Sequence, residues 1–123
     1  MPGSQRGRSS FPREHRLLDS AGYRRVFTAR RRVSARHGAF HVRPNGLDHA
    51  RLGITVSRKV SKKAVQRNRI KRQVREYFRH HRDSLKGMDL VFTAYPGCAE
   101  LDNPALARLL ESLWHRTEAK CAH

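Results

Sequence analysis

The sequence predicts an α+β fold in which helices pack, mostly on one face, against a small mixed β-sheet. Strand-like segments at 52–57 and 88–95 flank a long helical pattern, and this spacing is typical of a parallel strand–helix–strand unit. Regular leucine spacing near the end of the chain predicts a further amphipathic helix. Because 123 residues have room for one domain, we expect a single domain over 11–119 and a disordered basic arm at 1–10.

The first predicted element is a helix that begins at the Asp19-Ser20 pair and ends near Arg30. Asp and Ser at a helix start accept hydrogen bonds from backbone N–H groups that have no partner within the helix. Tyr23, Val26 and Phe27 fall on one stripe of this helix, which predicts the side that packs.

Two strands are expected next. Residues 38–43 alternate between apolar and polar side chains, and so do residues 52–57. The turn-forming sequence Pro44-Asn45-Gly46 follows the first of these segments. This pattern favours a β-hairpin in which the two strands pair directly.

The second half of the chain is predicted to form a helix, a strand and a helix, which gives the order α-β-β-α-β-α. Ser61 can cap a basic helix over 62–81. The apolar run at 88–95 predicts a central strand covered on both faces, because it lacks strict alternation. Asp102 or Asn103 then caps the last helix, whose buried stripe is predicted to be Leu106, Leu109, Leu110, Leu113 and Trp114.

Positive charge is the strongest functional signal in the chain. There are 27 Lys and Arg residues against 10 acidic residues, a net charge of +17 at pH 7. The segment from Arg58 to Arg82 is especially basic, and Glu76 is its one acid. Such a run repels itself unless a polyanion neutralises it. Nucleic acid is therefore the leading partner and an anionic membrane surface the second, while no apolar run is long enough to span a membrane.

Rotation by about 100° per residue separates the side chains of the 62–81 helix into two faces. One arc is apolar and consists of Ile70, Val74, Tyr77 and Phe78. The opposite side is polar and basic and consists of Asn68, Arg72, Arg75 and Arg79. The cations Arg69 and Lys71 lie between these two sides, one at each boundary. One face is expected to pack while the other offers donors to phosphates. The alternative is a solvated basic face without a ligand.

Two residues break this pattern. Val65 falls on the basic side, and Arg67 falls beside the apolar arc. We expect Arg67 to lay its stem on the core and to reach into an adjoining groove with its guanidinium group. Extension of the same side chain into solvent is the alternative.

The aromatic residues have two interpretations. Tyr23, Phe27 and Phe40 either belong to the core or form a floor on which unpaired bases stack. The stacking interpretation is supported by three polar residues expected at the open edge of a groove between the first helix and the sheet, namely Ser57, Arg58 and Lys59.

Several chemistries find no support in the sequence. No paired carboxylates, glycine-rich phosphate loop or nucleophile motif occurs, so we expect no catalytic residue. His37 and His41 share one face of a strand, but two such ligands do not make a zinc site. Cys98 and Cys121 lack metal-binding or disulfide spacing and are expected to be reduced thiols of a cytoplasmic protein. The first 15 residues contain no apolar segment, so no secretory signal is expected.

The run from Arg51 to Phe78 closely resembles the protein component of bacterial ribonuclease P. The resemblance rests above all on the RNR motif, present here within residues 63–72. It spans about residues 11–118 and includes Phe11-Pro12-Arg13-Glu14, Leu17-Leu18, the pair Tyr23 and Phe27, residues 94–97, and Leu101-Asp102-Asn103.

The resemblance implies a two-layer α/β sandwich, like the second domain of ribosomal protein S5, with a left-handed βαβ crossover where general rules favour a right-handed one. It implies an RNA-binding subunit of the ribonucleoprotein that removes 5′ leaders from precursor tRNAs, with catalysis in the RNA and an inactive protein alone. The expected partners are ribonuclease P RNA and precursor tRNA, with no membrane and no obligate protein partner. No cofactor is expected on the protein, and Mg²⁺ is expected on the RNA.

The resemblance also implies two binding surfaces. The RNA subunit is expected to contact Lys63, Arg67, Asn68, Arg69, Lys71, Arg72 and Arg75. The single-stranded leader is expected in a cleft with Tyr23, Phe27 and Phe40 as its floor and Ser57, Arg58 and Lys59 as its rim. Tyr95 departs from the family pattern, in which Arg or Lys is usual, and Tyr23 stands where Phe is commoner. A stand-alone RNA-binding or ribosomal-type protein is the alternative.

Overall fold

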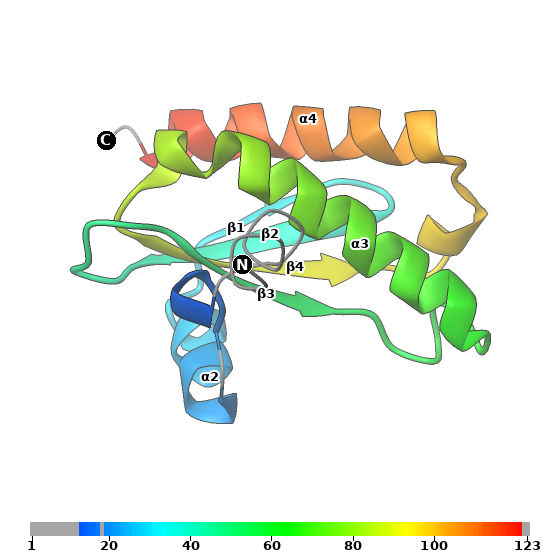
Figure 1. Ribbon diagram of the computed structural model, residues 1–123, viewed down its shortest axis with the longest axis horizontal. Helices are drawn as coiled ribbons and strands as arrows, with labels where there is room; N and C mark the ends of the chain where they lie inside the picture. Colours follow the sequence, from blue (N-terminus) through cyan, green and yellow to red (C-terminus); the bar gives the residue numbers. More distant parts are fainter. Residues whose placement is uncertain (1–12, 18, 122–123) are drawn as a thin grey trace, which may run out of the picture.

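The structure is a computed structural model that describes residues 13–17 and 19–121 (Figure 1). The predicted basic arm at 1–10, together with Phe11, Pro12 and Leu18, lies outside the described residues. In chain order the elements are η1 (Arg13–His15), α2 (Ser20–Thr28), β1 (Arg32–Ser34), β2 (Gly38–Pro44), β3 (Arg51–Thr55), α3 (Ala64–His81), η2 (Arg82–Leu85), β4 (Met88–Ala94), η3 (Cys98–Glu100) and α4 (Asn103–Cys121).

The strands form one mixed sheet in the order β1-β2-β4-β3. β2 pairs in antiparallel fashion with β1 and β4, while β3 pairs in parallel with β4. α3 joins the parallel pair, so the predicted strand–helix–strand unit is present. β4 is central and almost wholly buried, as the lack of strict alternation in its sequence indicated. The predicted α+β class and mixed sheet are confirmed.

The predicted hairpin between residues 38–43 and 52–57 is wrong, because β4 lies between β2 and β3. The segment after β2 does not close a tight turn. Instead, the Asn45 N–H donates to the Gly87 carbonyl, and the Gly87 N–H donates to the His49 carbonyl. The antiparallel neighbour next to β2 in sequence is β1. The sequence did not predict β1, because arginines surround Val33, its one buried side chain. Turn residues signal a bend, but they cannot reveal a strand that arrives later in the chain.

α3 and α4 cover one face of the sheet, and the shorter α2 lies against the other (Figure 1). The main core lies between the sheet and the two long helices, whose buried side chains are Ile70, Val74 and Phe78 on α3 and Leu106, Leu110, Leu113 and Trp114 on α4. These are the predicted stripes, with Tyr77 and Leu109 only partly buried. A smaller cluster under α2 contains Leu17, Val26 and Val91, with Tyr23 packed against it.

The predicted caps are present on α2 and α4 but not on α3. The Asp19 carboxylate accepts a hydrogen bond from the Gly22 N–H, and Asp102 accepts one from the Ala105 N–H. Each bond satisfies a backbone donor that has no partner within its helix.

Ser61 does not cap α3. Its hydroxyl accepts from the Lys63 N–H, one residue before the helix begins at Ala64, and the N-cap residue Lys63 makes no side-chain capping bond. Because α3 also carries a largely positive sequence, its stability must come from packing of its apolar side.

A buried ion pair ties the edge strand β3 to the central strand β4. Asp89 is fully buried, and Nε and Nη2 of Arg51 donate to its two carboxylate oxygens at 2.8 Å each. Nδ2 of Asn45 donates to the same carboxylate at 2.9 Å. The hydrogen bond to Asp89 raises the pKa of the Arg51 guanidinium above its usual value. Forked, charge-assisted bonds of this kind fix both position and orientation.

Asp89→Ala should therefore destabilise the fold strongly. Breaking a buried pair typically costs about 3–5 kcal/mol, and we expect about 3 kcal/mol here because the partly exposed Arg51 can turn toward water. Urea unfolding with an unchanged m-value would measure it. Asp83→Ala, at an exposed position on η2, is the matched control and should change stability by less than about 0.5 kcal/mol. Equal effects of the two substitutions would contradict the structural role of the pair.

Candidate nucleic-acid interface

The side of α3 that faces away from the core is polar and basic. Asn68, Arg72 and Arg75 are exposed, as is Lys63 at the helix start. Within the described residues, the Arg72 and Arg75 side chains have no hydrogen bond or ion pair to another residue. Val65 is 70% exposed, so it lies on this side, as predicted. From Asn68 onward, α3 thus separates an apolar side from a largely cationic one.

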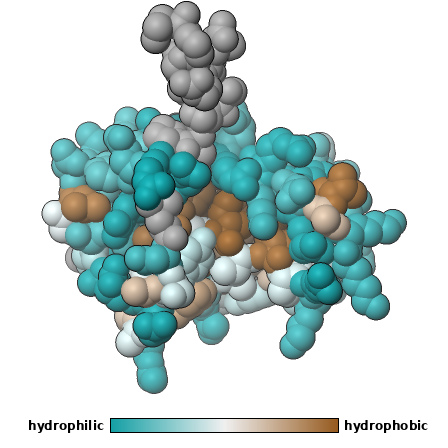
Figure 2. All heavy atoms as spheres, turned by 60° about the horizontal axis from the view of Figure 1, so that its bottom comes forward, coloured by the Kyte–Doolittle hydropathy of each residue, from teal (hydrophilic) through white to brown (hydrophobic). Residues whose placement is uncertain are grey.

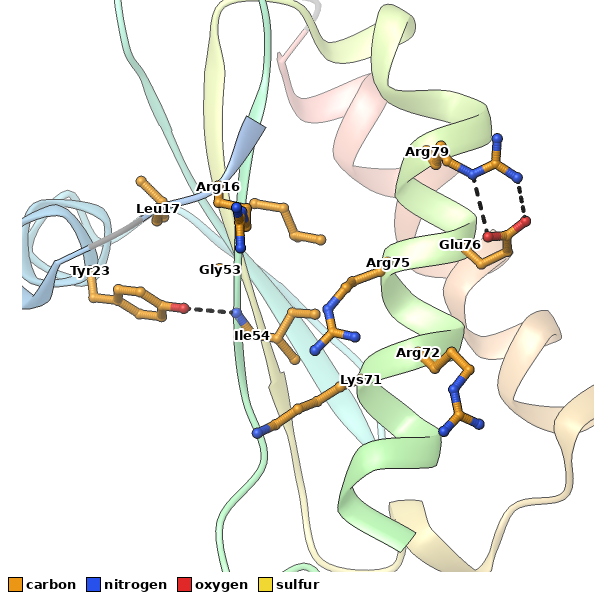
Figure 3. Close-up of a pocket in the computed structure, with 11 residues that line it drawn as sticks. Arg16, Leu17, Tyr23, Gly53, Ile54, Lys71, Arg72, Arg75, Glu76 and Arg79 are labelled. Atoms are coloured by element: carbon orange, nitrogen blue, oxygen red, sulfur yellow. Dashed lines mark hydrogen bonds and ion pairs between the residues drawn. The ribbon is translucent and has the colours of Figure 1, made fainter. Parts of the chain in front are cut away.

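A groove of about 560 Å³ runs between this side of α3 and the outer edge of β3. Figure 3 shows Lys71, Arg72 and Arg75 on the helix wall, with β3 opposite them and Tyr23 beyond the strand. Arg16, which precedes α2, also lines the groove. Cations from distant parts of the chain are therefore gathered along one channel, which suits a phosphodiester backbone.

The one acidic residue in the groove is paired within its own helix. Glu76 accepts hydrogen bonds from Arg79 at 2.6 Å and from His80 at 3.0 Å. The hydrogen bond from Arg79, followed by that from His80, lowers the pKa of Glu76, so the carboxylate stays ionised at neutral pH. Its charge offsets that of Arg79. Positive charge in the groove is therefore carried by Lys71, Arg72 and Arg75 on α3 and by Arg16.

Arg69 lies on the other shoulder of α3 and makes contacts within the fold. Its Nη2 donates to the carbonyls of Ala99 and Leu101 at 3.1 and 2.9 Å, and its Nη1 donates to the Asn103 side chain at 2.7 Å. Nε donates to Gln66. This guanidinium joins α3 to the start of α4, so the structure gives it a structural role that the sequence did not predict.

Arg67 also turns inward. Its Nη1 donates to the Ser61 carbonyl at 2.9 Å, and the side chain is half-buried. This contact fastens the turn before α3. Arg67 is absent from the lining of the groove, contrary to the reach that its position on the helix predicted.

Tyr23 is fixed at the edge of β3. Its hydroxyl oxygen accepts from the Ile54 N–H at 3.1 Å (Figure 3), and its ring lies directly over Gly53. A methyl group at position 53 would come within 2.6 Å of this ring. The extra hydroxyl of Tyr23, compared with the commoner Phe, thus satisfies a backbone donor at the sheet edge. Its own proton remains available to a ligand in the groove.

Phe27 and His41 form the exposed aromatic surface on the α2 face of the sheet. Phe27 is 39% exposed, and its ring centroid lies 4.7 Å from that of His41 in an edge-to-face arrangement. Burial, and then the nearby Arg32, lower the pKa of His41, so its ring is neutral at pH 7. On this side, hydrophobic side chains show between hydrophilic ones (Figure 2). A neutral ring pair beside cations suits the stacking of unpaired bases.

Phe40 does not belong to this surface, and its predicted place in the cleft floor is wrong. The residue is 1% exposed and packs against Phe92 and Trp114 in the main core. Successive residues of a strand point to opposite faces, so Phe40 faces α4 while His41 faces α2. That alternation could have identified His41 from the sequence once the position of α2 was known.

Three further residues of the predicted leader site follow the carboxyl end of β3. Ser57, Arg58 and Lys59 are exposed, and the Ser57 hydroxyl accepts from the Lys59 N–H in a turn. None of them lines the groove beside α3. Tyr95, at the equivalent end of β4, is half-buried, and its N–H donates to the His37 carbonyl.

The described residues contain no group of three or more His, Cys, Asp or Glu side chains placed to hold a metal ion. Both cysteines are free thiols, and burial raises the pKa of Cys98 to about 11. Among the helices of the described part of the chain, none is long and apolar enough to cross a membrane. The site described above consists instead of cationic and aromatic side chains.

The comparison with known proteins decides the family. A family model described as Ribonuclease P matches residues 11–118. The chain belongs to the ribonuclease P protein family. The ribonuclease P protein component of Stutzerimonas stutzeri is 46% identical over 107 residues, which cover 86% of this chain and 82% of the relative. That of Proteus mirabilis is 45% identical and covers 87% and 90%.

Solved structures agree with this assignment. The ribonuclease P protein of Staphylococcus aureus superimposes with a TM-score of 0.79 at 29% identity, covering 84% of this chain and 94% of the other. The Thermotoga maritima protein gives 0.66 at 32% identity, covering 79% and 96%. Membership of the ribonuclease P family implies a role in tRNA processing, RNA binding and partnership with ribonuclease P RNA.

The free energy of unfolding should distinguish the roles of Arg69 and Arg72 in α3. Arg69→Ala should lower the free energy of unfolding by about 2 kcal/mol, since bonds from a charged group contribute about 1.5–3 kcal/mol. Arg72→Ala, at an exposed position without such bonds, should change it by less than about 0.5 kcal/mol. Urea denaturation of both variants would measure this difference. Unchanged stability of Arg69→Ala would refute its structural role.

Proposed function

We propose that this chain docks on ribonuclease P RNA through the cationic side of α3. The observation that carries the proposal is the separation of this helix into a buried stripe of Ile70, Val74 and Phe78 and an exposed side with Asn68, Arg72 and Arg75. The groove beside it adds Lys71, and Lys63 extends the surface to the helix start. Arg67 and Arg69 contribute by holding the turn before α3 and the start of α4 in place.

The single-stranded leader of precursor tRNA is proposed to bind on the α2 side of the sheet. Phe27, with His41 at its edge, offers the stacking surface. Ser57, Arg58 and Lys59 supply hydrogen-bond donors at the end of β3. Tyr23, which lines the groove beside α3, is proposed to present its hydroxyl proton to a bound strand. Such an arrangement discriminates precursor from mature tRNA because only the precursor has a leader.

The protein is proposed to supply binding and no chemistry. The described residues contain no group of three or more His, Cys, Asp or Glu side chains placed to hold a metal ion, and the single acid of the groove, Glu76, is engaged with Arg79 and His80. The proposal assigns the Mg²⁺ ions of the reaction to the RNA subunit. By neutralising phosphates, the protein raises substrate affinity and favours divalent-ion binding by the RNA nearby. A cytoplasmic ribonucleoprotein without an obligate protein partner fits this role.

Protein freed rigorously of RNA should not cleave precursor tRNA in the presence of Mg²⁺. Added to a bacterial ribonuclease P RNA at limiting Mg²⁺, it should stimulate 5′ leader removal. The measurement is single-turnover cleavage with and without each component. Cleavage by the protein alone would refute the proposed division of labour, and absence of stimulation would favour a stand-alone RNA-binding protein.

Two substitutions should separate the two proposed surfaces. Arg72→Ala should weaken affinity for the RNA subunit and reduce the slope of log affinity against log salt by about 1, because the variant neutralises one phosphate fewer. Phe27→Ala should weaken precursor tRNA binding by about 5- to 150-fold, the range expected for one stacked base, with little effect on mature tRNA.

Filter binding or fluorescence anisotropy would measure these affinities. Arg108→Ala, an exposed cation on α4, is the control and should change neither. Equal losses for precursor and mature tRNA from Phe27→Ala would overturn the leader assignment, and a normal salt slope in Arg72→Ala would overturn the docking assignment.

A further inference from the structure

A second groove lies on another side of α2, away from the α3 groove. It has a volume of about 390 Å³ and is lined by Ala21, Arg24, Arg25, Thr28, Ala29 and Arg43. The α2 residues 21, 24, 25 and 28 follow helical spacing, so they form one side of the helix. Arg43 comes from β2, which makes up the opposite wall.

The three guanidinium groups of this groove have no partner of opposite charge. Within the described residues, none of them donates a hydrogen bond or joins an ion pair. Asp89 stands directly opposite Arg43 in the β2–β4 ladder and would be its natural partner. Both oxygens of that carboxylate are occupied by Arg51, so the charge of Arg43 stays available to the groove that it lines.

The acid nearest in sequence to α2 is also engaged. The Asp19 carboxylate accepts from the Gly22 N–H at the helix start. The groove therefore gathers three cations on a lining whose other members are Ala21, Thr28 and Ala29. None of these six lining residues is aromatic, so the groove offers no aromatic ring on which a base could stack. What it fits is a phosphodiester backbone, held without regard to sequence.

We propose that this groove binds phosphates of the precursor leader beyond the nucleotides that stack on Phe27. The inference rests on the proposed function, because it requires the leader to lie on the α2 side of the sheet. A strand that reaches Phe27 is already in contact with α2, and Thr28 of the groove is the next residue. α3, on which the RNA subunit is proposed to dock, lies across the sheet from α2 (Figure 1). α2 therefore binds the leader twice, by stacking on one side and by charge on another.

The test uses the holoenzyme assembled with saturating ribonuclease P RNA and precursor tRNAs with a graded series of leader lengths. The variant is Arg24→Ala/Arg25→Ala, which removes two exposed cations and keeps residues that favour helix. The control is Arg108→Ala/Lys120→Ala, which removes the same charge from exposed positions on α4. Thermal unfolding by circular dichroism checks that both variants fold, and affinity for the RNA subunit is measured separately.

In the wild-type and control holoenzymes, affinity should rise with leader length to a plateau. In the Arg24→Ala/Arg25→Ala holoenzyme the plateau should come at a shorter leader, and affinity for long leaders should fall roughly ten-fold, as for the loss of a charged hydrogen bond. The salt slope for long leaders should fall by about 0.7 for each single-strand phosphate that the variant no longer neutralises. Short leaders should bind as in the wild type.

Three results would overturn the proposal. Behaviour identical to the control would make the groove a solvated basic surface. An equal loss for short and long leaders would remove the link to the distal leader. A loss confined to RNA-subunit affinity would assign the groove to that RNA instead. Phe27→Ala with the short leader reports on the stacking surface alone, so failure of the leader assignment is distinguishable from failure of this groove.

Discussion

Packing of the apolar side of α3 is the interaction on which the rest of the structure depends. The helix has no side-chain cap and a run of like charges that opposes its formation. Burial of Ile70, Val74 and Phe78 offsets this, since each large apolar side chain contributes about 1.5–3 kcal/mol when it leaves water. The backbone that carries the cationic side is consequently folded before RNA binds. A disordered segment of the same composition would lose conformational entropy on binding.

Arginines of similar sequence context have different roles around this helix. Arg72 and Arg75 extend from it, while Arg69 and Arg67 bond to backbone carbonyls of neighbouring segments. Arg67 and Arg69 fix the position of α3 against the rest of the fold. Arg72 and Arg75 extend from the helix held in that position. Loss of RNA binding therefore has a different physical origin for each pair. Substitution of Arg67 or Arg69 removes bonds within the fold, whereas substitution of Arg72 or Arg75 removes a charge offered to RNA. Stability measurements separate them, because only the inward residues contribute bonds within the fold.

The sequence predicted the elements with regular periodicity well, because burial follows directly from helical spacing in α3 and α4. It failed where contacts between residues far apart in the chain determine the structure. The insertion of β4 between β2 and β3 removed the predicted hairpin. Phe40 was assigned to the wrong side because the face covered by α2 is not encoded locally, and His41 was missed for the same reason. The inward turn of Arg69 depends on carbonyls some thirty residues away, which no local pattern reveals.

The most direct measurement is site-specific photo-crosslinking of the assembled holoenzyme. A photoreactive side chain at Asn68, on the exposed side of α3, should crosslink to ribonuclease P RNA whether or not precursor tRNA is present. The same group at Ala107, exposed on α4, should give no such crosslink. Crosslinking from Ala107 but not from Asn68 would contradict the docking of RNA on α3, and with it the functional role of the buried stripe of this helix.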